Sequence, residues 1–481
     1  MSTKIGNLSE IQPHAVTQEK LSEWVLGFIG QFKVLRLLKP LSGFKTQGIS
    51  LSVILSALIL SRFKGLSHYA MCRLGQQLID ENTLYRMMNH PMMNWRSLFR
   101  GFALQFLRIT RLHGDASTGP NCFILDDTMI PKTGATIEGI SKVFDHVAKS
   151  YHLGFKLLVL ALYDGKSLLP IDFSMHRESQ KKNYGLTAKQ TKKQFGKKRP
   201  LNSPGEVRKE ELDSKKTGLA LDMLKRAFKH GITASYVLMD SWFTCDVLIQ
   251  GIRKLRKGSV HVIGMCKMDN RRFSTDDGRH LKSAAMITAN QSRKHKSRKY
   301  QSEYIRVDAM YMGTPVRLYY IRYHRANDCK LLLTTDVTLS FVQVMELYQI
   351  RWSIEVMFKE CKQYLRLGSA QNTDFDGQVA ATALTLITHI ILSLQLRFGK
   401  YETMGGLFRH TQMQLIEETL YQRIMQTILQ IIDQLLEIIC IDIDQTISDL
   451  ICDDGRNEQV INLLNAVNHL RTINAGSKMV A

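Results

Sequence analysis

The sequence of 481 residues predicts an α/β protein with an inserted antiparallel β segment and helical regions at both ends. An apolar strand, ASYVLMD, lies between an amphipathic helix, LALDMLKRAFKHG, and a second helix that begins after SWFTC. This alternation of strand and helix is typical of α/β folds. Short segments of alternating polarity between about 267 and 328 predict the insertion. Periodic apolar residues near both ends of the chain predict the flanking helices.

The first 115 residues are expected to form a helical, DNA-binding region. Apolar residues recur with helical spacing in ISLSVILSALIL and in WRSLFRGFALQFLRI. Between them, residues 66–90 resemble a helix-turn-helix, in which Ser67 would cap the first helix and Thr83 and Arg86 would lie on the second. A plain helical hairpin explains the same pattern, so both interpretations stay open.

Residues 116–400 are expected to form the α/β domain. The apolar run in NCFILDDT predicts a strand that ends in two carboxylates, Asp126 and Asp127. Leu157–Tyr163 and Ser167–Phe173 predict a β-hairpin. Residues 177–218 are basic and contain Gly, Pro and Ser, which predicts a mobile loop that is either solvated or binds phosphate.

Residues 348–362, YQIRWSIEVMFKECK, predict a helix with one apolar and one polar face. Tyr348, Arg351 and Glu355 fall on one line of such a helix, and Lys359 and Lys362 continue it. A surface helix with an ordinary Arg351–Glu355 ion pair explains the spacing equally well, because such pairs are common and weak. Whether Lys359 contacts a ligand or only solvent stays open.

The C-terminal part of the chain is predicted to be helical. QVAATALTLITHIILSLQLRF is apolar enough for a long buried helix. Residues 401–481 have helical periodicity and become acidic, which favours contacts with protein over contacts with DNA. We therefore expect an oligomerisation region there.

The net charge of the chain favours some classes of function over others. Lys and Arg number 65 against 43 Asp and Glu, a formal charge of +22, which favours a polyanionic partner such as nucleic acid. A ribosomal or membrane-surface role is the competing explanation. The apolar run Ile49–Leu60 is too short to cross a bilayer, so no membrane partner is expected. The eight cysteines form no CxxC pair, which fits a reducing cytoplasm and argues against a zinc ribbon.

Acidic residues follow the predicted strands. Asp126 and Asp127 end one strand, Asp240 ends another, and Glu355 lies on the helix described above. Carboxylates that converge at strand ends can hold Mg²⁺, which prefers oxygen ligands and serves phosphoryl transfer. Neighbours in a strand point to opposite faces, so only one of the two adjacent aspartates is expected to reach the metal. Turn formation or helix capping is the alternative role for each aspartate.

Three motifs carry a resemblance to a known family. The row formed by Tyr348, Arg351, Glu355 and Lys362 is similar to the Y-R-E-K signature of bacterial DDE transposases of insertion-sequence family four. LDDT resembles the segment of the family's first acid, and YVLMDSWF resembles that of the second. The motifs occur in the family's order, and the resemblance covers residues 120–400 approximately.

The resemblance implies a ribonuclease-H-like core with an inserted β subdomain. It implies that Asp127, Asp240 and Glu355 are the catalytic metal ligands for Mg²⁺, with Mn²⁺ able to substitute. It also implies cleavage at transposon ends and strand transfer into target DNA, by a homodimer on double-stranded DNA in the bacterial cytoplasm, associated with the nucleoid. The residues expected to contact DNA are Tyr348, Arg351, Lys362, Trp242 and Trp352. The alternative to DNA contact for the two tryptophans is that their side chains pack in the protein core.

Two rival functions fit part of the sequence. Glu360 and Lys362 match the E-x-K element of restriction-type nucleases, with Asp127 as a possible partner, but that element belongs on a strand and this segment has a helical pattern. A transposase-derived protein that binds DNA without cutting it is the second rival. All three predicted catalytic acids are present, which argues against a protein that has lost the ability to cleave DNA.

Overall fold

The computed structural model describes residues 32–44, 48–64, 79–115, 119–145, 148–178, 182–275, 277–323, 328–399, 401–409 and 411. The chain divides into two compact units, Met1–Thr411 and Gln412–Ala481, and all described residues belong to the first. The predicted helices of the C-terminal region lie almost entirely outside the described residues. The domain boundaries given above therefore remain predictions.

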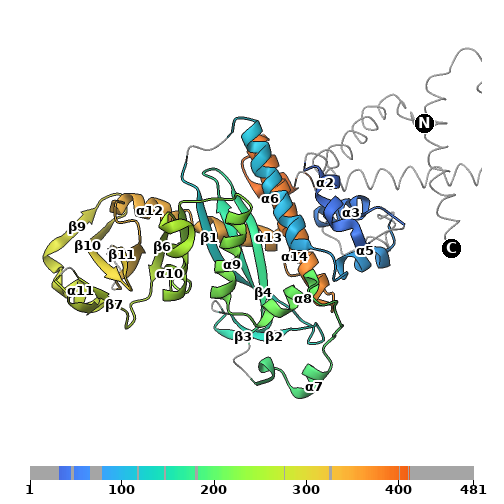
Figure 1. Ribbon diagram of the computed structural model, residues 1–481, viewed down its shortest axis with the longest axis horizontal. Coiled ribbons are helices and arrows are strands. Elements are labelled where there is room, and N and C mark those ends of the chain that lie inside the picture. Colours follow the sequence, from blue (N-terminus) through green and yellow to red (C-terminus); the bar gives the residue numbers. More distant parts are fainter. Residues whose placement is uncertain are drawn as a thin grey trace, which may run out of the picture. The chain divides into compact units, whose positions relative to one another are not determined.

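One mixed sheet of twelve strands organises the first unit (Figure 1). Its first part consists of β1 (Cys122–Pro131), β2 (Ser141–Asp145), β3 (Ser150–Tyr163), β4 (Leu168–His176), β5 (Tyr236–Met239) and β6 (His261–Cys266). β3 lies antiparallel to β1, and β2 and β4 follow one another along the other edge of β3. On its second side β1 pairs in parallel with β5, which pairs in parallel with β6. The antiparallel strands β1 to β4, followed by the parallel strands β5 and β6, are consistent with the predicted ribonuclease-H-like α/β core, and the hairpin of β3 and β4 is confirmed.

The insertion continues the same sheet. It contributes β7 (Arg272–Ser274), β8 (His280–Lys282), β9 (Lys294–Ser297), β10 (Ser302–Tyr311) and β11 (Thr314–Tyr323), with one helix, α11 (Ser283–Ala289). β11 pairs with β12 (Lys330–Thr334), and β12 pairs antiparallel with β6. The predicted antiparallel insertion is confirmed, and it is joined to the core by a continuous hydrogen-bond ladder.

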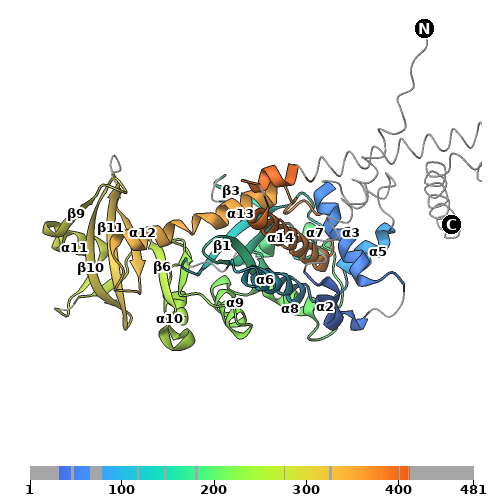
Figure 2. The same ribbon diagram turned by 90° about the horizontal axis from the view of Figure 1, so that it is seen from above.

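Helices cover both faces of the core sheet. Those named below are α5 (Glu81–Met88), α6 (Trp95–Leu112), α7 (Ala188–Lys192), α8 (Pro204–Glu210), α9 (Lys216–Lys229), α10 (Asp246–Lys254), α12 (Phe341–Gln349), α13 (Trp352–Gln363) and α14 (Phe375–Phe398). α9 and α13 lie on opposite sides of β1 (Figure 2). In the described part of the chain, α14 alone is long and apolar enough to cross a membrane, but 89% of its apolar window is buried inside the protein. It is therefore the central core helix, as the sequence predicts.

The proposed helix-turn-helix is described only in its second half. α5 contains Thr83 and Arg86, and Asp80 caps it by accepting a hydrogen bond from the Thr83 backbone N–H, 3.3 Å away. Ser67 and the first predicted helix lie outside the described residues. The choice between a helix-turn-helix and a plain hairpin therefore stays open.

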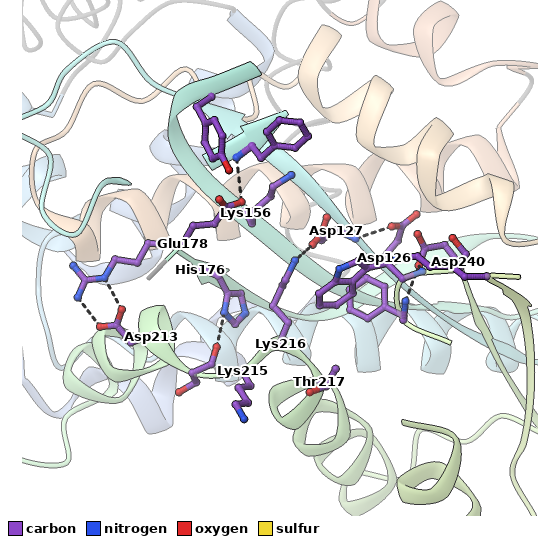
Figure 3. Close-up of a pocket in the computed structure, with 18 residues that line it drawn as sticks. Asp126, Asp127, Lys156, His176, Glu178, Asp213, Lys215, Lys216, Thr217 and Asp240 are labelled. Carbon is purple, nitrogen blue, oxygen red and sulfur yellow. Dashed lines mark hydrogen bonds and ion pairs between the residues drawn. The ribbon is translucent and has the colours of Figure 1, made fainter. Parts of the chain in front are cut away.

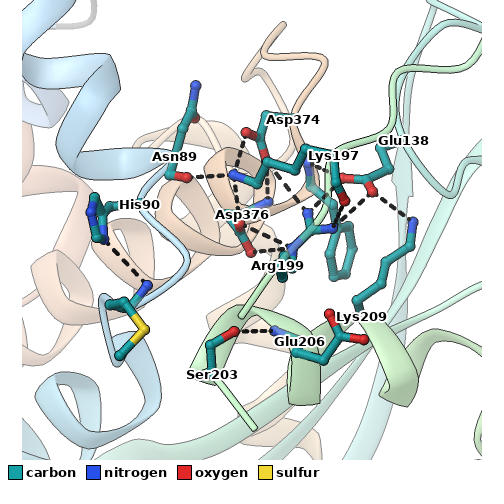
Figure 4. Close-up of polar contacts among 12 residues, drawn as sticks. Asn89, His90, Glu138, Lys197, Arg199, Ser203, Glu206, Lys209, Asp374 and Asp376 are labelled. Carbon is teal, nitrogen blue, oxygen red and sulfur yellow. Dashed lines mark hydrogen bonds and ion pairs between the residues drawn. The ribbon is translucent and has the colours of Figure 1, made fainter. Parts of the chain in front are cut away.

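The basic segment 177–218 is folded where the structure describes it, so the prediction of a mobile loop is wrong for residues 182–218. It contains α7 and α8 and the start of α9. Lys197 and Arg199 reach into a cluster of three acids, Glu138, Asp374 and Asp376 (Figure 4). Distant acids therefore fix a segment whose composition alone suggests a solvated chain.

Gly154 marks a close approach of two strands, and its replacement by Ala is expected to destabilise the fold. A Cβ atom at Gly154 would lie 2.3 Å from the backbone oxygen of Ile130, which cannot move unless β1 moves. We expect Gly154→Ala to cost about 1–3 kcal/mol, measured by urea unfolding. Gly196→Ala, which meets no atom within 4 Å, is the matched control. Equal unfolding midpoints for the two variants would contradict this packing.

Candidate active site

The two adjacent aspartates of β1 project to opposite faces of the sheet. The last paired residues of β1 and β5 are Leu125 and Met239. Asp126 and Asp240 directly follow this pair, so their side chains lie on the same face of the sheet. Figure 3 shows the Asp126 and Asp240 carboxylates side by side and the Asp127 carboxylate turned toward Lys216. Strand alternation therefore joins Asp126, not Asp127, to the second acid.

The Asp126 carboxylate is bound by the predicted arginine. Arg351 Nη1 lies 3.1 Å from Asp126 Oδ2, and Arg351 Nη2 lies 2.6 Å from Glu355 Oε1. Burial raises the pKa of Asp126 to about 7, and the negative charge of Asp240 adds to the rise while Arg351 opposes it. One guanidinium thus links the acid on β1 to the acid on α13, and the i,i+4 pair predicted from sequence is present as part of this larger group.

Asp127 has a separate set of contacts. Its carboxylate forms an ion pair with Lys216, the first residue of α9. Lys216 Nζ also lies 4.1 Å from the centroid of the Trp242 ring, a cation–π contact. Asp127 is therefore neutralised on the α9 side of the sheet.

Asp240 is held by the turn that follows β5. Its Oδ1 accepts hydrogen bonds from the backbone N–H groups of Trp242, at 3.0 Å, and Phe243, at 2.9 Å. These bonds are local and fix the orientation of the carboxylate beside Asp126.

The helix predicted over residues 348–362 is divided in two at Ile350 and Arg351, where α12 ends and α13 begins. Arg351 thereby directly precedes α13, one turn ahead of Glu355, and its side chain forms no capping hydrogen bond with the helix. Its guanidinium carbon lies 5.7 Å from the centroid of the Tyr348 ring. Lys362, at the far end of α13, donates a hydrogen bond of 2.7 Å to Thr128 Oγ1 on β1. Arg351 and Lys362 therefore contact β1 from the two ends of α13, with Glu355 between them, while Tyr348 lies in the last turn of α12.

The insertion supports this helix pair. Phe341, the first residue of α12, stacks on Tyr304 of β10 with ring centroids 3.9 Å apart and planes at 12°. It also contacts Tyr319 of β11, at 5.4 Å. Because α12 leads directly into α13, aromatic packing on the insertion helps to place Glu355.

A comparison with family models identifies residues 43–312 as a match to the DDE superfamily endonuclease model. The chain belongs to the DDE superfamily endonucleases. The match includes Asp126, Asp127 and Asp240 and ends before α13. No curated protein matches the chain. Membership supports a nuclease or transposase type of enzyme with DNA as its substrate.

The carboxylates of this DDE endonuclease fit the divalent metal that its superfamily typically uses. Asp126 and Asp240 offer adjacent hard oxygen ligands, and their mutual repulsion is the kind that a bound cation relieves. Mg²⁺ needs only one or two protein carboxylates, with water and phosphate completing its shell. Within the described ranges, no three His, Cys, Asp or Glu side chains gather tightly enough to hold one ion, because Arg351 lies between Asp126 and Glu355.

Both tryptophans of the endonuclease that were expected to contact DNA are accessible. Trp352 is 62% exposed and Trp242 is 42% exposed, so the alternative of core packing is wrong for both. Trp242 lines the cavity beside the acids, whereas Trp352 lies at the start of α13. A second opening is lined by both adjacent aspartates, Asp126 and Asp127, together with Asp240, Glu355, Lys359 and Lys362, which places Lys359 on the same side as the acids.

Sequence reasoning did not find two basic residues of the endonuclease site, Lys216 and Lys156. Lys216 binds Asp127, and Lys156 on β3 lines the same cavity. The signal for Lys156 was a single charge directly before the apolar strand Leu157–Tyr163 of the predicted hairpin. For Lys216, the only signal was its place in the basic segment 177–218, which was predicted to be a loop that is either solvated or binds phosphate.

Proposed function

We propose that this DDE endonuclease is a DNA transposase of the insertion-sequence family four type. It would cleave at transposon ends and transfer the resulting 3′-hydroxyl into target DNA. The observation that carries the proposal is the contact of one arginine, Arg351, with acids from two distant parts of the chain, Asp126 and Glu355. This contact joins the Y-R-E-K row to the strand that carries the LDDT segment.

We assign the catalytic acids as Asp126, Asp240 and Glu355. The resemblance alone indicated Asp127 in place of Asp126, but the shared face with Asp240 and the contact with Arg351 favour Asp126. Mg²⁺, or Mn²⁺ in its place, would supply an activated attacking oxygen and stabilise the leaving oxygen. The chain's part is to hold its carboxylates in position and to keep the reacting phosphate beside them.

The cations of the row would bind that phosphate. Arg351 offers a planar fork that matches two phosphate oxygens, and Lys362 offers a point charge near Thr128. The half-buried Tyr348 ring supports the guanidinium, and Trp242 and Trp352 are available for stacking on bases. The partners would be transposon-end and target DNA in the bacterial cytoplasm, associated with the nucleoid, with two copies acting together on paired ends.

The restriction-type alternative gains no support from the geometry. Glu360 and Lys362 lie on a helix, and Glu360 Oε2 lies 3.4 Å from His389 Nε2, away from the acids. The alternative of a DNA-binding protein without cleavage is addressed by experiment.

The test uses full-length protein, Mg²⁺ and duplex DNA taken from the borders of its coding sequence. Cleavage that exposes a 3′-hydroxyl, followed by joining of that end to a plasmid, is the expected result. Glu355→Gln should abolish both steps and keep DNA binding, and a chelator should do the same. Cleavage without joining would reduce the assignment to an endonuclease, and binding without cleavage would favour the non-catalytic alternative.

A further inference from the structure

A cavity of about 930 Å³ opens on the α9 side of the sheet (Figure 3). Asp126 and Asp240 lie at one end of it, and the cavity extends past Asp127 to β3 and β4. The residues of the row on α13 line a second opening, which shares Asp126, Asp127 and Asp240 with this cavity but does not reach β3 or β4. The part of the cavity along β3 and β4 is therefore not explained by the phosphate contacts assigned above.

Lys156 is a buried cation in this cavity. Its position on β3 is opposite Met129 of β1 and His176 of β4, and only 7% of the residue is exposed. In the part of the chain that the structure describes, the Lys156 ammonium forms no side-chain hydrogen bond or ion pair, and its Nζ is not among the fully buried polar atoms without a partner, so it is open to the cavity that it lines. A cation that is largely removed from solvent, has no counter-ion and faces a cavity favours an anionic ligand at this position.

Two of the acids around Lys156 have cationic partners, and a third, Glu178, is oriented by a backbone amide. Asp127 is paired with Lys216, and Asp213 is paired with Arg177 at 2.5 Å. Glu178 accepts a hydrogen bond of 3.0 Å from the Phe144 backbone N–H.

His176, the residue paired with Lys156 on β4, does not add a second cation at this position. Burial lowers the pKa of His176 to about 4, with Lys216 adding to the fall, so the ring is neutral at pH 7. Lys216 has its own acid partner, which leaves Lys156 as a cation that these side chains do not neutralise.

We propose that Lys156 binds a phosphate group of a DNA strand that enters this cavity next to the acids. The proposal rests on the proposed function in taking DNA as the ligand, and it adds a phosphate contact on the face of β1 opposite to Arg351. The continuity of the cavity from Asp126 to Lys156 supplies the path. A phosphate, which carries a full negative charge and several acceptor oxygens, satisfies an ammonium group with three donors.

The experiment neutralises single phosphates in the DNA and compares protein variants. Full-length protein is bound, in Ca²⁺ to prevent cleavage, to any duplex that it cuts, with one methylphosphonate placed at successive positions around the cut. For the wild type, one position is expected to weaken binding about tenfold. Lys156→Met should weaken binding to unmodified DNA by a similar factor. A methylphosphonate at that one position should then have no further effect on the binding of the variant, while the effects at the other positions stay as in the wild type. Lys142→Met, an exposed lysine on β2, is the matched control and should keep the wild-type pattern.

Each outcome decides the proposal. If Lys156→Met keeps the full wild-type sensitivity at every position, the contact is absent and the proposal is overturned. Lys156→Arg, which keeps the charge, should retain the sensitive position, so a loss caused only by misfolding is recognised. If inorganic phosphate stabilises the wild type against heat but not Lys156→Met, and the DNA pattern is unchanged between them, the ligand is free phosphate and the DNA assignment fails. Because binding is measured, failure of strand transfer would leave this test intact.

Discussion

Asp126→Asn is expected to reduce DNA cleavage by at least about 10²–10³-fold, whereas Asp127→Asn retains most of the activity. Asp126 shares its face with Asp240 and is bound by Arg351, so its carboxylate lies where the reacting phosphate is proposed to bind. Asp127 points to the other face and is paired with Lys216. Both variants replace an aspartate by an asparagine at neighbouring positions. A difference in their activity therefore reports where the carboxylate lies and not the type of residue that was changed.

The measurement is single-turnover cleavage of end-bearing DNA in Mg²⁺, with DNA affinity determined for both variants. Urea unfolding should give similar midpoints, because Asn is nearly isosteric with Asp. A larger loss in Asp127→Asn than in Asp126→Asn would reverse the assignment and restore the residue indicated by the LDDT resemblance. Equal and large losses would mean that both carboxylates act on the metal.

Arg199→Ala is expected to destabilise the protein by about 3–5 kcal/mol, because it leaves buried acids without their partner. Arg199 binds Glu138 through two hydrogen bonds, of 2.9 and 2.6 Å, and Asp376 through its Nε, at 3.1 Å. Its side chain is 2% exposed. Although burial alone would raise the pKa of Glu138, the hydrogen bonds from Arg199 and the charge of Lys209 hold it below its usual value.

Thermal and urea unfolding measure this effect, and Lys198→Ala provides the control. Lys198 is the neighbouring cation, but it is exposed and forms no ion pair among the described residues, so its loss should change stability by less than about 0.5 kcal/mol. Arg199→Lys should recover only part of the stability, since an ammonium cannot form the two parallel bonds to Glu138. If Arg199→Ala and Lys198→Ala unfold alike, the cluster does not hold the segment in place.

Local signals in the sequence predicted much of the fold. The hairpin of β3 and β4 turns at Asp164 and Gly165, as expected, because turn chemistry and strand pattern are encoded in neighbouring residues. The strand before Asp240 and the buried helix α14 were predicted for the same reason.

Features that depend on distant residues could not be predicted in the same way. Alternation showed that only one of Asp126 and Asp127 could face Asp240, but the choice depends on which side of β1 α9 and α13 pack. Residues 182–218 were taken for a mobile loop because their cations have no acids nearby in sequence. Their partners, such as Glu138 and Asp374, are contributed by segments some 60 and 177 residues away along the chain.

The continuous ladder from β6 through β12 to β11 limits how this enzyme could be shortened. Removal of residues 267–328 would leave β12 as the last strand, with three consecutive leucines, Leu331, Leu332 and Leu333, and a row of unpaired backbone groups. Such an exposed apolar edge is a template for aggregation. It would also take away the aromatic platform under Phe341. A compact version of the enzyme, whether made in the laboratory or by natural deletion, would therefore need a new edge-protecting strand or charged residues on β12 before it could remain soluble.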